Sequence, residues 1–322
     1  MMKKLSQVFL MVLVVSMMCI LPNVQKAEAA YPEKPITMIV VNSAGGGVDG
    51  LNRAIASRLE KELGVTIVVK NEPGSGGRKG SISLFKSTPD GYTIGMPHFA
   101  ALLYDKVLAG TELPIDYEKF EVLMRADTTE FFVIVNKDSP YQSIQDFKTA
   151  GKPIKFAGSG VGNPSWLQPT ALASVMGFEV NFVTGHKNLR ESALSLARGD
   201  VEASVGSFTH FQGVLDDVRP LVYISGGKSS NLPDVPNIVD AGYPKLAYLG
   251  VPWVLAAPPG TPEDILTVLR TTLNKIATSD EFITWATSRG YNPSSQGPEE
   301  FWKSFAEMEQ VYTGMKPFME KK

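Results

Sequence analysis

Glycine-rich turns placed between an apolar run and a helix-like stretch are the segments of this chain best suited to binding chemistry. The first, VNSAGGGVDGLNR (41–53), contains Gly45, Gly47 and Gly50 in G-x-G-x-x-G spacing. Glu72 stands about 20 residues further on, where a dinucleotide-binding fold would hold a ribose hydroxyl. The turn therefore fits two kinds of site: a dinucleotide pocket, or a loop whose main-chain N–H groups bind another anion.

Two further segments repeat the order of strand, glycine-rich turn and helix, namely VVKNEPGSGGRKGSISLF (68–85) and IKFAGSGVGNPSWLQPTALASVMG (154–177). In parallel α/β sheets such turns gather at the carboxyl ends of strands, where ligands bind. Each offers N–H groups and the positive end of a helix to an anion. Three such turns around one cleft could hold a carboxylate without any arginine. The alternative is that each turn is only a connection that needs positive φ.

Asp49 follows the first turn and admits two roles. It can be the N-cap of the first helix, or it can accept a hydrogen bond from an amine, a hydroxyl or a bridging water of a ligand. The two roles are compatible, because a cap residue at this place would face the cleft. We expect replacement of Asp49 by Ala to weaken ligand binding more than it weakens the fold.

The first 29 residues have the order of a secretory signal peptide: the basic start MMKK, an apolar core, and small residues up to Ala29. Cys19, the only cysteine, lies in this segment, so the mature chain has no thiol chemistry. Cleavage changes the net charge from −2 to about −4, which argues against nucleic acid as a partner. An exported protein also meets little NAD or ATP. We therefore expect a periplasmic protein without a cofactor.

Short apolar runs alternate with helical patterns along the mature chain, which indicates an α/β architecture with largely parallel strands. The helix after the first turn has Leu51, Ile55, Leu59 and Leu63 four residues apart, a spacing that predicts one buried stripe.

Clusters of structure-breaking residues at 125–129 and 241–252 divide the chain. We expect two lobes, the second inserted into the first, with two crossover strands acting as a hinge. Residues 31–128 and 252–322 form lobe 1, and residues 129–251 form lobe 2.

Over essentially its whole mature length, the chain resembles the extracytoplasmic receptors of tripartite tricarboxylate transporters, also called Bug-type receptors. YPEKPITMIVVNSAGGGVDG (31–50) is similar to the opening of that family, and VVKNEPGSGGRKG (68–80) with TPDGYTIGM (88–96) is similar to its second loop. AAPPGTPEDILTVLRTTLNKI (256–276) and GPEEFWKSFAEMEQVY (297–312) continue the likeness. The resemblance implies a two-lobe periplasmic-binding-protein fold of type II, the Venus-flytrap fold, which captures a small carboxylate and passes it to a membrane permease.

The resemblance also implies a set of ligand-binding residues in the three turns. Lobe 1 contributes Ala44, Gly45, Gly46, Gly47 and Asp49 from the first turn and Gly74, Ser75, Gly76 and Gly77 from the second. Lobe 2 contributes Ser159, Gly160, Gly162, Asn163 and Ser165 from the third turn, together with Trp166, His186, Lys187 and Ser207. His186 stands where the family commonly has tyrosine, and Trp166 stands in a segment where a serine-then-histidine pattern is usual. We expect these two residues to tune the choice of ligand, although Trp166 can equally be a packed core indole.

An exported hydrolase that acts on a small carboxylate or ester in the same cleft is the alternative function. The nucleophile motif G-x-S-x-G fails at PGSGG (73–77), because Pro73 occupies the first glycine position. His98, His186 and His210 have no paired spacing for a metal, and we expect His98 and His210 to face solvent or to be satisfied in the core. The prediction is a monomeric receptor without catalytic residues or a metal. Its partners are a small organic acid and the permease subunits of a tripartite transporter.

Overall fold

The computed structural model describes residues 31–158, 160, 162–186 and 188–319. The chain divides into a unit that ends at Glu33 and a second unit that begins at Lys34, and the helices and strands described below belong to the second unit. The expected signal peptide, residues 1–29, lies outside the described residues. Within them, no helix combines the length and the apolar character that a bilayer crossing needs.

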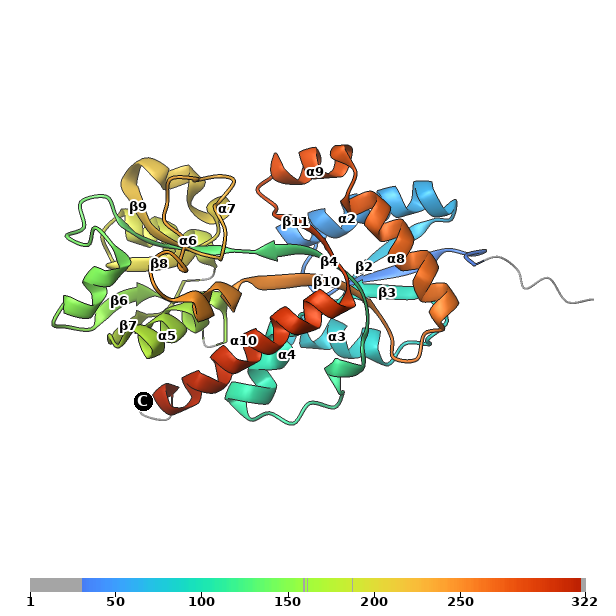
Figure 1. Cartoon of the computed structure of the whole chain (residues 1–322), viewed down its shortest axis with the longest axis horizontal. Helices are drawn as coiled ribbons and strands as arrows, with labels where there is room; N and C mark the ends of the chain where they lie inside the picture. Colours follow the sequence, from blue (N-terminus) through green and yellow to red (C-terminus); the bar gives the residue numbers. More distant parts are fainter. Residues whose placement is uncertain (1–30, 159, 161, 187, 320–322) are drawn as a thin grey trace, which may run out of the picture. The chain divides into compact units, whose positions relative to one another are not determined.

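A six-stranded mixed sheet is the centre of lobe 1, with the strand order β11-β4-β10-β3-β1-β2 (Figure 1). β1 pairs in parallel with β2 and β3, whereas β10 is antiparallel to β3 and β4, and β11 is antiparallel to β4. The strands are β1 (Ile36–Val40), β2 (Ile67–Asn71), β3 (Thr93–Met96), β4 (Glu121–Thr129), β10 (Val251–Ala257) and β11 (Pro293–Gln296).

Helices of lobe 1 pack around this sheet. They are α2 (Gly47–Leu63), α3 (Arg78–Phe85), α4 (Phe99–Tyr104), α8 (Glu263–Ala277), α9 (Asp280–Thr287) and α10 (Pro298–Met319), with the short helical segments η1 (Ser75–Gly77), η2 (Asp105–Ala109) and η3 (Tyr117–Lys119). The predicted stripe of α2 is confirmed, because Leu51, Ile55 and Leu59 are fully buried. Burial of this stripe fixes the direction in which α2 leaves the first glycine turn, and α2 contacts β2 and α8.

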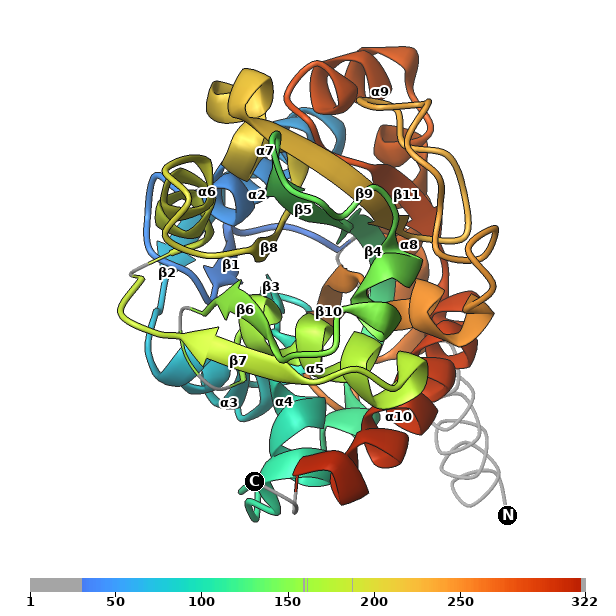
Figure 2. The same ribbon diagram turned by 90° about the vertical axis from the view of Figure 1, so that its left-hand side faces the viewer.

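Lobe 2 is built on a five-stranded sheet with the order β7-β6-β8-β5-β9, seen from its own side in Figure 2. Its strands are β5 (Phe131–Asn136), β6 (Ile154–Ala157), β7 (Val180–Val183), β8 (Ala203–Gly206) and β9 (Val218–Ile224). Its helical segments are η4 (Ile144–Thr149), α5 (Pro164–Met176), α6 (Leu189–Ala197), α7 (Phe208–Phe211), η5 (Gln212–Asp217) and η6 (Pro244–Leu249). Phe132, Ile134, Leu196 and Phe211 belong to one buried cluster that holds α6 and α7 on this sheet.

Two crossings connect the lobes. The chain leaves the first sheet at the end of β4 and enters the second sheet at β5, with Glu130 between them, and it returns through η6 into β10. The two crossings lie side by side, because Thr129 of β4 pairs with Val251 of β10. Sheet membership thus changes close to the expected lobe limits at 128/129 and 251/252, which themselves stay a prediction.

Two expectations about the sheets are wrong. The strands are not largely parallel, because β4, β5 and β10 run antiparallel to their neighbours where the chain crosses between the sheets. Residues 125–129 are not a break, since they complete β4. This polar segment is held as a strand by pairing with β10 and β11, and the buried carboxylate of Asp127 accepts a hydrogen bond from the Asn292 N–H, with 2.6 Å between Oδ1 and N.

Candidate functional site

A cavity of about 580 Å³, called here the cleft, lies between the two lobes beside the crossings. Lobe 1 lines it with Asn42, Gly47, His98, Trp253, Arg289 and Tyr291, and lobe 2 lines it with Pro164, Asn188, Arg190, Ser207, Thr209 and His210. The first crossing adds the consecutive residues 127–132. The volume lies within the range of about 300–1,000 Å³ that is usual for small-molecule sites.

The first glycine turn is held in place by Asp49. Its Oδ2 accepts hydrogen bonds from the Gly45 N–H and from Arg53 Nε, and its Oδ1 accepts one from Asn71 Nδ2, each at 2.9 Å. The N-cap of α2 is Gly46, so Asp49 is the third residue of the helix and the N-cap expectation is wrong. A carboxylate at this position can bind an N–H of the preceding turn, as in one half of a capping box. The Gly45 N–H is therefore already occupied.

The protonation of Asp49 follows from these contacts. Burial raises the pKa of this carboxyl, but the hydrogen bonds from Arg53, Gly45 and Asn71 outweigh burial and lower the pKa to about 2. Asp49 is thus an anion at every physiological pH. Among the ligand-binding residues predicted in the first turn, Gly47 lines the cleft, and its carbonyl oxygen accepts a 2.6 Å hydrogen bond from the Tyr291 hydroxyl.

The second glycine turn supports the cleft without lining it. Gly74, Ser75, Gly76 and Gly77 all have positive φ, from 47° at Ser75 to 140° at Gly74. A Cβ at Gly77 would lie 3.0 Å from the Cβ of His98, so the turn comes close to a cleft residue from behind. Arg78, the next residue, pairs with the buried carboxylate of Asp105 and donates to the Ser75 carbonyl at 2.7 Å. These contacts hold the second turn in place behind His98, where it supports the wall of the cleft.

His98 is a cleft residue that sequence reasoning assigned to solvent or core. Its Nδ1 accepts a hydrogen bond from the Ala101 N–H at 3.0 Å, which leaves Nε2 to carry the proton of the neutral ring. Its ring meets the edge of Trp253 at a centroid distance of 5.0 Å. Burial lowers the pKa of His98 to about 4, with a smaller effect from Arg78. His98 is therefore a neutral hydrogen-bond donor at neutral pH.

The third turn belongs to lobe 2, and its predicted residues have structural contacts. Ser159 and Lys187 lie outside the described residues. Asn163 is the N-cap of α5, Ser165 is buried, and Gly160 and Gly162 have positive φ. Trp166 is half-buried and stacks on Phe182 at a centroid distance of 5.9 Å, and His186 Nδ1 lies 3.3 Å from the Gly158 carbonyl oxygen. From this region, Pro164 lines the cleft.

Ser207 and His210 form a short polar pair in the cleft at the start of α7. Ser207 Oγ lies 2.6 Å from His210 Nδ1 and 3.0 Å from Thr209 Oγ1, and the Ser207 N–H also donates to Nδ1 at 3.3 Å. Burial lowers the pKa of His210, and the nearby cation of Arg190 lowers it further. The pair is a helix cap with a neutral imidazole.

Arg190 and Arg289 bring a guanidinium to the cleft from each lobe. Arg190 is exposed near the start of α6, and Arg289 follows α9, where its guanidinium carbon lies 5.0 Å from the ring centre of Trp285. Within the described residues, neither forms an ion pair with a carboxylate. Two guanidinium groups are thus available to an anion in the cleft.

The acids of the cleft belong to the first crossing. Burial raises the pKa of Asp127 to about 7, and burial also raises the pKa of Glu130. The Ser225 hydroxyl donates to Glu130 Oε1 at 2.6 Å. Because both carboxyl groups bind protons more readily than usual, they oppose an anionic ligand less than two ordinary carboxylates would. No cluster of three metal-ligating residues is found in the described part of the chain.

The structure brings two of the predicted residues, Gly47 and Ser207, to the lining of the cleft, and it places the other described ones behind it or around it. The assignment of all of them to ligand binding stays a prediction. Sequence reasoning missed His98, Arg190, Arg289, Tyr291 and the two crossing acids. Arg190 lies in the first turn of α6 and Arg289 follows α9. Neither belongs to a sequence motif, so the fold alone identifies them as cleft residues.

Comparison with known proteins gives one consistent picture. The family model described as the tripartite tricarboxylate transporter family receptor matches residues 51–310. A UPF0065 protein from the tcbD–tcbE intergenic region of Pseudomonas sp. strain P51 is 28% identical over 281 residues, which is 84% of this chain and 82% of the relative. Protein BugT of Bordetella pertussis is 27% identical over 298 residues, 88% of this chain and 89% of the relative.

Among solved structures, a TctC solute binding protein from Polaromonas, crystallised without ligand, aligns with a TM-score of 0.76 and 25% identity over 88% of this chain and 98% of its own. It has the same two-lobe arrangement of mixed sheets that is described above. Because the family model covers most of the sequence and the fold agrees, this chain belongs to the tripartite tricarboxylate transporter receptor family, a family of solute-binding receptors.

Proposed function

We propose that this chain is a periplasmic receptor that captures a small carboxylate in the cleft and delivers it to the membrane subunits of a tripartite tricarboxylate-type transporter. The observation that carries the proposal is the presence of Arg190 and Arg289, from different lobes, in the lining of one cavity. A guanidinium binds a carboxylate through two parallel hydrogen bonds, and such charge-assisted bonds are stronger than neutral ones.

A ligand with two carboxylate groups makes the best use of this arrangement. One carboxylate can engage Arg190 while the other engages Arg289, so that a single molecule bridges the lobes. Bridging favours the arrangement in which the lobes are close, and exclusion of water then strengthens both ion pairs. His98, as a neutral donor, and the Ser207 hydroxyl supply polar contacts without adding charge.

A receptor fits the cleft better than a hydrolase. The Ser207–His210 pair resembles a nucleophile with its base, but a base must become an imidazolium during the reaction. Arg190 opposes that change, because its cation lowers the pKa of His210. The same Arg190 favours the capture of an anion.

Calorimetric titration of the purified mature protein with a panel of aliphatic dicarboxylates, their monocarboxylate counterparts and their diamides tests this proposal. We expect dicarboxylates to bind best and diamides to show no binding. Arg190→Gln and Arg289→Gln should each weaken binding by roughly 10- to 100-fold, the loss of a hydrogen bond to a charged group. Arg198→Gln is the matched control, since Arg198 is exposed, pairs with Asp200 and does not line the cleft.

Two outcomes would contradict the receptor proposal. Full affinity in both cleft variants would remove the guanidinium groups from the site. Turnover of ester substrates by the wild-type protein, lost on Ser207→Ala, would instead support the hydrolase. For location, we expect amino-terminal sequencing of the protein from a periplasmic fraction to begin at Ala30, which the intact precursor would not do.

A further inference from the structure

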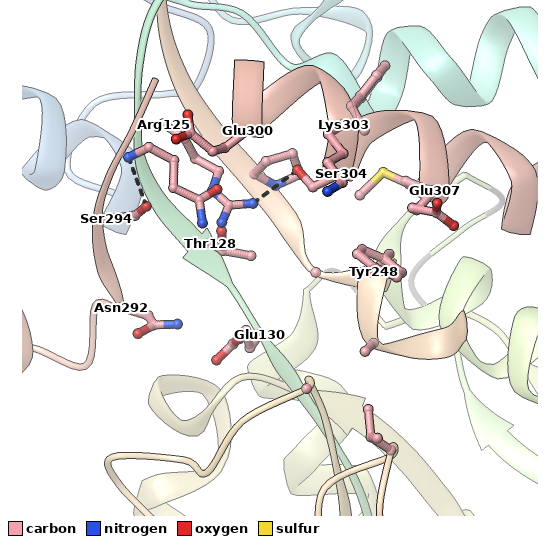
Figure 3. A pocket seen from close by; sticks show the side chains of 18 of the residues that line it. Arg125, Thr128, Glu130, Tyr248, Asn292, Ser294, Glu300, Lys303, Ser304 and Glu307 are labelled. Atoms are coloured by element: carbon pink, nitrogen blue, oxygen red, sulfur yellow. Dashed lines mark hydrogen bonds between the residues drawn. The ribbon is translucent and has the colours of Figure 1, made fainter. Parts of the chain in front are cut away.

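A second cavity, of about 720 Å³, lies on the other side of the crossings from the cleft, and we call it the rear cavity (Figure 3). β4 and β11 of lobe 1 contribute residues to it, as do α10 and, from lobe 2, η6. Thr128, Glu130 and Asn292 line both cavities, but none of the other cleft residues named above lines the rear cavity. Apart from these three shared residues, the rear cavity therefore has a lining of its own.

Three residues that line the rear cavity carry a buried polar atom that has no hydrogen-bond partner among the described residues. Within the described residues, Arg125 Nε, Thr128 Oγ1 and Gln296 Oε1 are buried and have no hydrogen-bond partner, and all three residues line this cavity. Native structures rarely leave such atoms unpaired, and each one calls for an explanation such as an absent ion or ligand. These three residues line one cavity, so its wall holds polar groups whose hydrogen bonds are incomplete.

Arg125 is the group with the strongest need for a partner. Its one side-chain hydrogen bond is a long contact of 3.4 Å from NH1 to Ser304 Oγ, drawn as a dashed line in Figure 3. Burial lowers the pKa of Arg125, yet a guanidinium stays charged at neutral pH. Within the described residues it forms no ion pair. The nearby carboxyl groups of Glu130 and Asp127 raise the pKa of Arg125, but burial outweighs them, so the cation can still gain from an anion in contact with it.

The charges around Arg125 limit the size of that anion. Besides Arg125, the cavity lining holds the cations Lys245 and Lys303, and these three are balanced by the acids Glu130, Glu300 and Glu307 (Figure 3). Such a lining has no excess positive charge to hold a polyanion. It suits a molecule with a single negative group, and the planar guanidinium suits a carboxylate.

We propose that the rear cavity is a second ligand site of this protein, which binds a small monocarboxylate through Arg125. The carboxylate binds the partly exposed guanidinium of Arg125, and a turn of the Arg125 and Thr128 side chains brings the buried Nε–H and the hydroxyl to it. The amide oxygen of Gln296 is left for a donor group on the same ligand or for a water molecule.

Acetate is the probe for this site, because it carries the carboxylate and little else. Mature protein labelled with ¹⁵N is titrated with acetate, and the Nε–Hε signals of its arginines are followed by NMR. Arg125→Lys identifies the Arg125 signal by its disappearance. We expect this signal to move with a saturable dependence on acetate. Arg270 is the internal control, since its Nε–H already donates to the Val122 carbonyl at 3.1 Å and should not move.

Variants separate this proposal from the receptor proposal. In an Arg190→Gln/Arg289→Gln double variant the Arg125 response should persist, whereas Thr128→Val should weaken acetate binding about 3- to 10-fold through the loss of one hydrogen bond. A shift that never saturates, or one that vanishes in the double variant, would overturn the rear site. A saturable Arg125 response in a protein whose cleft binds no carboxylate would leave the rear site standing and overturn only the receptor proposal.

Discussion

Asp127, at the start of the first crossing, is a carboxyl group with only 2% of its surface exposed. Burial of this kind disfavours its ionised form. Burial raises its pKa from 3.8 to about 7, and the hydrogen bonds from the Asn292 and Thr128 N–H groups do not compensate. The folded state therefore holds a proton that the unfolded state has already released. As the pH rises from about 4 to about 7, ionisation of Asp127 makes the folded state progressively less stable relative to the unfolded state.

Asp127→Asn should remove this pH dependence, because the amide keeps the shape of the side chain and its acceptor oxygen but cannot ionise. We expect the variant to gain stability over the wild type as the pH rises from 4 to 7.5, by at most about 4 kcal/mol. Urea unfolding at several pH values measures the gain. His98, whose lowered pKa acts in the opposite direction, is present in both proteins and cancels in the difference. A difference that does not change with pH would refute the assignment.

Gly77 is needed for two reasons that a pair of variants can separate. Its φ is +90°, and a Cβ there would lie 3.0 Å from His98 Cβ and 3.2 Å from a methyl group of Val41. Gly110 has φ +61° and nothing within 4 Å of its missing Cβ. In both Ala variants, the positive φ strains the backbone and lowers the free energy of unfolding by about 1–3 kcal/mol. Only Gly77→Ala should also displace His98, which we expect to appear as a changed His98 ring signal in NMR and weaker ligand binding.

At the scale of elements, the first turn, α2 and β2 are tied together through one carboxylate. Asp49→Ala removes three hydrogen bonds that end on a buried anion, so we expect a loss of about 2–3 kcal/mol in the free energy of unfolding. Paired urea unfolding and ligand titration compare this loss with the loss of binding that the sequence led us to expect. Asn71→Ala removes one of these three bonds and also the bonds of Asn71 to the Asn42 carbonyl and to Arg53, so we expect a loss of similar size. Equal stability of wild type and Asp49→Ala would exclude the structural role.

Most elements of the fold could be predicted from local patterns. The segments that form β1, β2 and β3 are rich in apolar and β-branched residues, and apolar residues recur every four positions along α2. These local patterns are enough to predict that the segments are buried. β4 was missed because its second half, with Arg125 and Asp127, is polar. Such a strand is stable only because β10 and β11 pair with it on both sides, and pairing across more than 100 residues leaves no local signal.

The candidate site was less predictable for the same reason. The glycine turns were recognisable because positive φ and small size constrain the residue type. Arg190 and Arg289 are ordinary surface arginines in the sequence. They become a pair only when the two crossings bring α6 and the segment after α9 to one cavity. Partners that meet through tertiary structure cannot be read from spacing along the chain.

At the scale of the whole molecule, the two cavities share part of their lining. The segment from Arg289 to Asn292 lines the cleft, and from Asn292 to Gln296 it contributes to the rear cavity. A ligand that shifts this segment in one cavity changes the other, and such coupling must be reciprocal.

We therefore expect saturating acetate to change the affinity of the cleft for its dicarboxylate by about 5-fold or more, in either direction. Calorimetric titrations of the dicarboxylate with and without acetate, at constant ionic strength, measure the factor. Arg125→Lys serves as the control, because the effect should disappear there while binding in the cleft remains. The same factor in wild type and variant would show that acetate acts elsewhere, for example by direct competition.

The pairing of Thr129 with Val251 has a consequence for how proteins of this kind can diversify. The entry to lobe 2 and its exit are neighbouring strands, so the backbone enters and leaves the insertion at one place, although α5 and η6 also pack on α10. A lobe 2 from a related receptor could be inserted between Thr129 and Val251, because both junctions lie on paired strands. The pairing within the sheet of lobe 1 would then stay the same. Recombination at these two junctions would exchange Arg190 and Ser207 for another set of side chains opposite an unchanged Arg289, and thereby create new specificities in one step.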